Sequence, residues 1–304
     1  MSALIKHRRV SAAVLAALLF IASGCVSVQR QPVSDPWALF SEQHRIYVQL
    51  PAAANKPLAV RILRQMMPSV SEAEQEYILE RLGTVYMGIS PEPETEAAAF
   101  ELAVQGDFPR AAVSAAFSEK YGWQRRRFGV QGNTYEYFVR SDAAFEAAPL
   151  ASDMICLASS MEPMIERYAA SQPDMTAAGI RQKLTGGVPD EQSIRFYCDG
   201  ASMLPFAGGM FQIPAVSSVS GSLTPAADEE GTRFFVFSGS IAAADKRIVN
   251  GISVILRFAA AGMGGSVSAV EDVILIEGLR LDEEMVYSII ERNLPLSFLS
   301  GERN

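Results

Sequence analysis

The chain has 304 residues, of which 34 are acidic and 26 are basic, so its formal net charge at pH 7 is −8. Nucleic-acid affinity depends on neutralising phosphates with Lys and Arg, so this acidic balance argues against a nucleic-acid partner. Apolar residues make up 49% of the chain, which is enough for a real core, and the length suits two modest domains or one large one.

The N-terminus has the pattern of an export signal. Three basic residues precede an uncharged apolar run over residues 10–22, and small residues lead up to Cys25. A transmembrane helix needs about 20 apolar residues, so this run is too short to cross a bilayer. The pattern therefore predicts a cleaved secretory signal peptide over residues 1–24.

The residues around the cleavage point add an anchor. Ala22-Ser23-Gly24 followed by Cys25 resembles the lipobox of bacterial lipoproteins. This resemblance implies lipidation of Cys25, a position in the cell envelope, and residues 25–36 as a tether. Val26 stands where inner-membrane lipoproteins typically have aspartate, so the resemblance favours the outer membrane over the inner one. Plain secretion without a lipid is the alternative.

Removal of the signal peptide makes the chain more acidic. The signal contains three basic residues and no acidic ones, so the mature charge is 23 − 34 = −11. A net negative charge of this size disfavours adsorption to anionic lipid headgroups. We therefore expect the lipid to supply the attachment to the membrane.

Residues 37–170 have the periodicity of an α+β subdomain. Apolar and polar residues alternate in segments typical of strands, and these segments are separated by amphipathic segments typical of helices. The predicted strands are residues 46–50, 84–89, 98–106 and 153–158, and the predicted helices are residues 57–67, 71–82, 109–120 and 162–170.

An extra hairpin is predicted within this first part, over residues 121–139. Residues 123–128 and 134–139 are rich in aromatic residues and arginine, and Gly129 and Gly132 lie between them. Two strand-like runs joined by a short glycine-containing segment are typical of a β-hairpin.

Residues 193–304 show a similar order of elements after a linker over residues 171–192, where prolines and glycines cluster. The predicted strands are residues 194–198, 216–223, 232–241 and 270–277, and the predicted helices are residues 201–211, 243–261 and 282–293.

Both parts thus follow the order βαββαβ and end in a helix, which is the ferredoxin-like order. We predict an α+β protein of two ferredoxin-like subdomains that form a pseudo-repeat. Each subdomain would have its own antiparallel sheet with helices on one face.

Few residues are suited to catalysis or metal binding. His44 is the only histidine after cleavage, and no nearby residue suggests a nucleophile or an orienting partner, so we expect a solvated side chain. Cys156 and Cys198 lie in apolar strand patterns, which favours buried free thiols, with a disulfide as the alternative. This set makes a zinc site of the usual ligands very improbable, and we expect neither a metal nor another cofactor.

The hairpin is the best candidate for a partner-binding surface. Its arginines form the densest basic cluster of an acidic chain, and aromatic residues surround them. Arginine and aromatic residues are enriched at the centres of protein interfaces. The candidate residues are Trp123, Arg125, Arg126, Arg127, Tyr135 and Tyr137. The alternative is an ordinary β-extension with solvated arginines.

The leading hypothesis is a non-enzymatic lipoprotein of the cell envelope that binds a protein partner or acts in envelope assembly. One alternative is a carrier of a lipid or other hydrophobic ligand in a cleft between the two halves. Another is a hydrolase that uses carboxylates from acidic clusters such as residues 228–230; two of them would have to converge with perturbed pKa values.

Overall fold

The computed structural model describes residues 33–66, 71–91, 98–140, 145–170, 177–184, 191–200 and 216–293. Residues 32–304 belong to one compact unit. The predicted signal peptide, Cys25 and the helix predicted over residues 201–211 lie outside the described residues.

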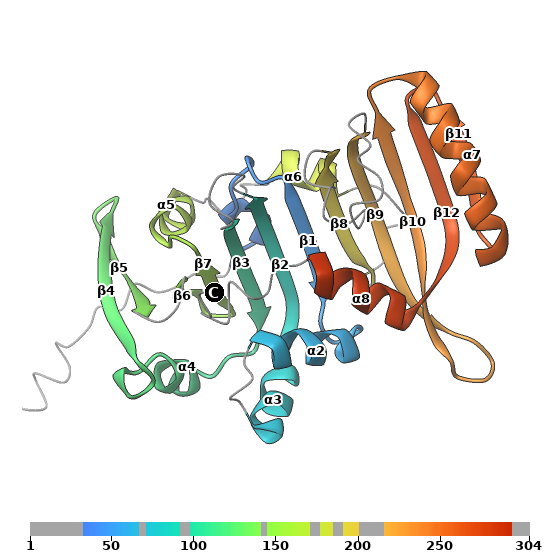
Figure 1. Ribbon diagram of the computed structural model, residues 1–304. Helices are drawn as coiled ribbons and strands as arrows, with labels where there is room; N and C mark the ends of the chain where they lie inside the picture. The colour runs from blue at the N-terminus through green and yellow to red at the C-terminus, as the bar shows by residue number, and fades with distance from the viewer. Residues whose placement is uncertain are drawn as a thin grey trace, which may run out of the picture. The chain divides into compact units, whose positions relative to one another are not determined.

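The core of the fold, over the described residues, is a single sheet of twelve strands in which every pairing is antiparallel (Figure 1). The strand order is β11-β12-β10-β9-β8-β1-β2-β3-β7-β6-β5-β4. The strands are β1 Ile46–Pro51, β2 Leu82–Pro91, β3 Ala98–Gly106, β4 Trp123–Val130, β5 Asn133–Arg140, β6 Glu146–Ala151, β7 Met154–Ala158, β8 Ile194–Asp199, β9 Val216–Ala227, β10 Arg233–Ala243, β11 Ser266–Val270 and β12 Val273–Asp282.

The prediction of two separate ferredoxin-like sheets is not what the structure shows. β1 pairs with β2 on one side and with β8 on the other, so the sheet continues from residues 37–170 into residues 193–304. In two separate sheets, β1 and β8 would each expose a row of unpaired backbone groups. Joining them satisfies these groups and merges the two parts into one α+β sheet.

Helices cover both faces of the sheet, whereas we expected them on one face. On β1, Tyr47 packs with η1, α5 and α6, while Leu50, which faces the opposite way, packs with α2 and α8. The strands in this region carry apolar side chains on both faces, and both sets need a cover. The helices are η1 Pro36–Leu39, α2 Lys56–Met66, α3 Glu72–Leu79, α4 Arg110–Ala116, η2 Glu119–Tyr121, α5 Glu162–Ala170, α6 Ala178–Lys183, α7 Lys246–Met263 and α8 Glu283–Asn293.

Most predicted elements lie within a few residues of their predicted positions, including the hairpin of β4 and β5. β6, β11 and η1 were not predicted from the sequence. β6 contains three alanines and a proline, which are poor indicators of a strand, and β11 has only five residues beside a glycine-rich segment.

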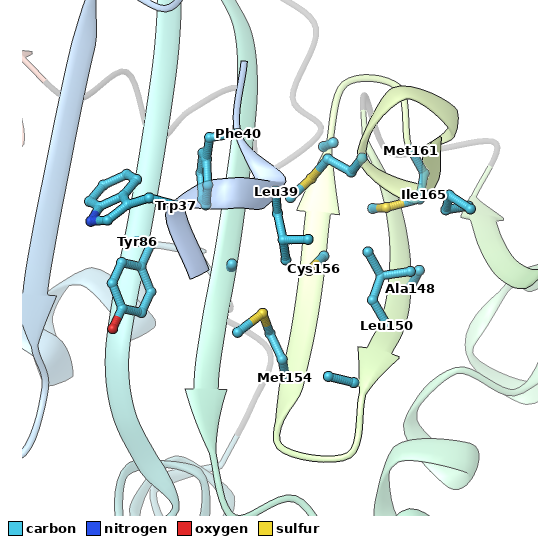
Figure 2. Packing of buried hydrophobic residues seen from close by; sticks show 14 of the residues in the cluster. Trp37, Leu39, Phe40, Tyr86, Ala148, Leu150, Met154, Cys156, Met161 and Ile165 are labelled. Atoms are coloured by element: carbon cyan, nitrogen blue, oxygen red, sulfur yellow. The ribbon is translucent and has the colours of Figure 1, made fainter. Parts of the chain in front are cut away.

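The segment after the predicted tether enters the core directly. The side chains of Trp37, Leu39 and Phe40 are buried against β2, β7 and α5 (Figure 2). Asp35, within the tether predicted over residues 25–36, is also buried, and it accepts hydrogen bonds from the Ala177 amide and the Arg181 side chain. The predicted tether therefore includes at least one residue, Asp35, that belongs to the packed core.

Candidate functional site

A buried polar cluster surrounds Glu101 of β3. Its Oε2 lies 2.9 Å from Nε2 of His44 and accepts a 2.8 Å hydrogen bond from the Ser41 amide, and its Oε1 forms an ion pair with Arg167 of α5. The other ring nitrogen of His44, Nδ1, lies 2.9 Å from Oγ of Ser90. His44 is 7% exposed, so the expectation of a solvated histidine is wrong.

Opposing effects determine the ionisation of Glu101. Burial by itself would raise the pKa of its carboxyl group. The hydrogen bond with His44 and the charge of Arg167 outweigh burial and lower the pKa of Glu101 below its ordinary value. The carboxylate is therefore held in its charged form.

Ser90, His44 and Glu101 contact one another in the same order as the serine, histidine and carboxylate of a catalytic triad in nucleophilic hydrolases. Two features argue against that chemistry. Arg167 neutralises the carboxylate that would have to stabilise an imidazolium, and the imidazole ring is buried. Arg167 also donates a 2.6 Å hydrogen bond to the carbonyl oxygen of Leu39, so the cluster attaches the N-terminal segment to the sheet.

The hairpin separates the two kinds of residue that the sequence grouped together. Trp123 and Tyr137 are buried: Trp123 packs with Phe117 and Phe138, and the Tyr137 hydroxyl donates to Glu162. Tyr135 is half-buried against Tyr168. These aromatic side chains anchor the hairpin to the protein and leave little of their surface for a partner.

The three arginines of β4 remain at the surface. The alternation of the strand places Arg125 and Arg127 on one face, where both lie near Glu136 of β5, and Arg126 on the other. All three are exposed. The hairpin therefore presents a cationic surface without an aromatic centre.

A second exposed surface lies on α7, a helix predicted from the sequence but with no predicted function. Val249, Ser253 and Ala260 are buried against the sheet. Val254, Ile255 and Phe258 point outward, and Phe258 is 79% exposed. We call these three exposed residues the α7 face.

All charged side chains of α7 are basic. The helix contains Lys246, Arg247 and Arg257 and no acidic residue, although the chain as a whole is acidic. Asp245 caps its N-terminus by accepting a 2.8 Å hydrogen bond from the Arg247 amide. Apolar residues on all sides of residues 251–263 were the signal in the sequence that could have identified this surface.

Cys156 and Cys198 are free and buried, which confirms the favoured prediction over a disulfide. Burial raises the pKa of both thiols, that of Cys198 to about 12, so neither is a ready nucleophile. In the described part of the chain no group of three or more His, Cys, Asp or Glu side chains could hold a metal ion. Among the same residues, no helix is long and apolar enough to cross a membrane.

The model of a protein family, "Outer membrane-associated lipoprotein TP0453", matches residues 31–287. The chain belongs to this family. Crystal form I of TP0453 has a TM-score of 0.61 and 16% sequence identity, and the match covers 88% of this chain and 99% of that one. Crystal form III has a TM-score of 0.61 and 17% identity, with 84% and 97% covered. These structures share the fold, and no curated protein matches the sequence.

Membership of the TP0453 family confirms the predicted location, because the family is one of outer membrane-associated lipoproteins. It also identifies the mature domain, which the lipobox alone did not. The attachment of the lipid to Cys25 stays a prediction from the sequence, since that residue precedes the matched range.

Proposed function

We propose that this lipoprotein is a non-enzymatic protein of the outer membrane that lies against the lipid surface through the α7 face and serves as a docking or assembly component there. The lipid on Cys25 would bring the protein to the bilayer, and α7 would orient it. The observation that carries this proposal is the outward-facing apolar surface of Val254, Ile255 and Phe258.

Such a surface needs an explanation, because contiguous exposed apolar patches mark sites of contact with proteins or membranes. A lipid surface fits α7 better than a protein does. A helix with an apolar face, basic residues and no acidic residue is typical of segments that lie in the membrane interface. The basic residues of α7 also make this one helix suitable for contact with anionic headgroups, although the net negative charge of the whole chain disfavours such contact.

The lowered pKa values of two carboxyl groups support the proposal that the protein is not an enzyme. Glu101 and Asp228 have lowered pKa values among the described carboxyl groups, and each is paired with an arginine. A carboxyl group that donates a proton in hydrolysis needs a raised pKa. Neither residue therefore fits the proton-donating role that the hydrolase alternative requires, and no observation among the described residues favours the carrier.

Flotation with lipid vesicles tests the proposal. Residues 26–304, which lack Cys25, would be mixed with phosphatidylcholine vesicles with and without phosphatidylglycerol. We expect flotation that increases with the anionic lipid, and a decrease of about tenfold in the partition coefficient for Ile255→Glu together with Phe258→Glu.

The matched control is Tyr77→Glu together with Tyr121→Glu, which places the same two charges at exposed aromatic residues outside α7. This control should float like the unmodified protein. Equal flotation of the α7 variant and the unmodified protein would exclude α7 as the membrane contact.

A further inference from the structure

Among the described residues, β4 forms one end of the sheet and is paired only with β5. The turn between them consists of Gln131 and Gly132, and their positive φ angles of 51° and 76° are those of a type I′ hairpin. The pair that closes such a turn, here Val130 and Asn133, is hydrogen-bonded, and bonded and non-bonded pairs then alternate along the strands.

This alternation determines which backbone groups of β4 face outward. Phe128, Arg126 and Gln124 are two, four and six residues before Val130 and bond to β5. Arg125 and Arg127 lie between them, so their N–H and C=O groups point away from β5 along the open edge. In the described residues, β4 has no register shift and no proline that would block an added strand.

The charge of this edge restricts what can pair with it. The hairpin contains four arginines and one glutamate, Glu136. A second copy of the chain adding its own β4 would place arginine beside arginine, and like charges on adjacent strands are destabilising. The other end of the sheet, β11, has the sequence SVSAV and offers no carboxylate.

We propose that the β4 edge binds an extended, acidic segment of a partner protein as a thirteenth strand. Backbone hydrogen bonds to Arg125 and Arg127 supply the pairing, and carboxylates at alternate positions of the partner face their side chains. The arginines repel the β4 edge of a second copy of the protein and attract an acidic partner. The same charges therefore disfavour self-association and favour the acidic segment. This surface is at the opposite end of the strand order from β11 and β12, on which α7 packs.

A peptide in solution tests this proposal without membranes, so its result is independent of the α7 contact. The probe is a fluorescein-labelled peptide with the sequence Thr-Glu-Val-Glu-Val-Glu-Thr, added to residues 26–304 and followed by fluorescence anisotropy. Arg125→Glu together with Arg127→Glu should weaken binding by about tenfold or more. Lys56→Glu together with Arg64→Glu on α2, an equal change of charge, should leave the affinity unchanged.

Strand addition is separated from simple charge attraction by a second peptide with the same side chains and N-methylated backbone at alternate residues. This peptide should not bind, because it cannot pair along the edge. Amide hydrogen exchange should also slow by about tenfold at Arg125 and Arg127 when the first peptide binds, and change little at Arg126, whose amide already bonds to β5.

Three results would overturn the proposal. The first is no binding of the probe peptide, and the second is equal binding of the N-methylated one. The third is a double arginine variant that loses binding to anionic vesicles and keeps its affinity for the peptide, which would assign the arginines to the membrane.

Discussion

Glu101 is the residue on which the attachment of the N-terminal segment depends. It contacts the Ser41 amide, His44 and Arg167, and its side chain is 9% exposed. Removing one partner of a buried ion pair leaves the other charge uncompensated.

We expect Glu101→Gln to lower the free energy of unfolding by about 3 kcal/mol, because Arg167 then remains half-buried without a counter-charge. Urea denaturation measures this value. Glu136→Gln removes a partly exposed carboxylate that is also near two arginines at the surface, and its effect should stay within about 0.5 kcal/mol. Similar losses in both variants would mean that the Glu101 cluster contributes no more than a surface pair.

The same carboxylate predicts a dependence on pH. The pKa of Glu101 is lowered in the folded state, so the unfolded chain binds the proton more readily. The stability from this residue is therefore present above the ordinary glutamate pKa of about 4.3 and is lost as the pH falls through the lowered folded value. Urea denaturation between pH 7 and pH 3 should show a larger loss for the unmodified protein than for Glu101→Gln. Parallel curves would contradict the assignment.

Ser90 provides a check on the proposal that the protein is not a hydrolase. Because Arg167 neutralises Glu101 and the His44 ring is buried, we expect no covalent labelling of Ser90 by a fluorophosphonate, as measured by intact mass. An adduct that forms on the unmodified protein and is lost in Ser90→Ala would show that this serine is an activated nucleophile.

At the scale of the element, α7 and the hairpin show that local patterns predict a helix or a strand more reliably than they predict its surroundings. Both were placed correctly, yet two of the three aromatic residues expected at the hairpin's interface, Trp123 and Tyr137, are buried in the protein. An alternating strand always has two faces, and the rest of the fold determines which one is covered.

The hairpin turn gives a prediction that depends only on local structure. Gln131 has a φ of 51°, which is strained for a residue with a side chain, while glycine adopts it freely. Gln131→Gly should therefore raise the free energy of unfolding by about 0.5 kcal/mol. Thermal denaturation compared with Gln124→Gly, which weakens the interior of β4, measures the difference. A destabilised Gln131→Gly variant would show that the turn is not strained.

At the scale of the whole molecule, the single sheet replaces the predicted pseudo-repeat. Leu50 and Leu58 of the first part pack in one cluster with Ile194, Phe235 and Tyr287 of the second. A shared cluster and a shared sheet couple the two parts energetically.

This coupling predicts one cooperative unfolding transition in urea. Tryptophan fluorescence reports on the first part, because Trp37 and Trp123 both lie there. Alkylation of Cys198, in a Cys156→Ala background, reports on the second part through β8. The two probes should give the same midpoint. Two separate midpoints would instead support independent subdomains.

The sequence by itself determined the features that depend on neighbouring residues. The positions of most strands and helices and the buried free thiols follow from local composition and periodicity. The outer-membrane location follows from the resemblance to the lipobox, and the signal peptide stays a prediction. These properties need no knowledge of which segments meet in space.

Only the tertiary structure decided the features that join distant residues. The pairing of β1 with β8 merged two expected sheets, and the approach of Glu101 to His44 turned a histidine expected in solvent into part of the core. The packing of α7 against β10, β11 and β12 left one of its two apolar sides uncovered. Each outcome depends on how competing surfaces are buried across the whole chain, and periodicity along a segment carries no information about that choice.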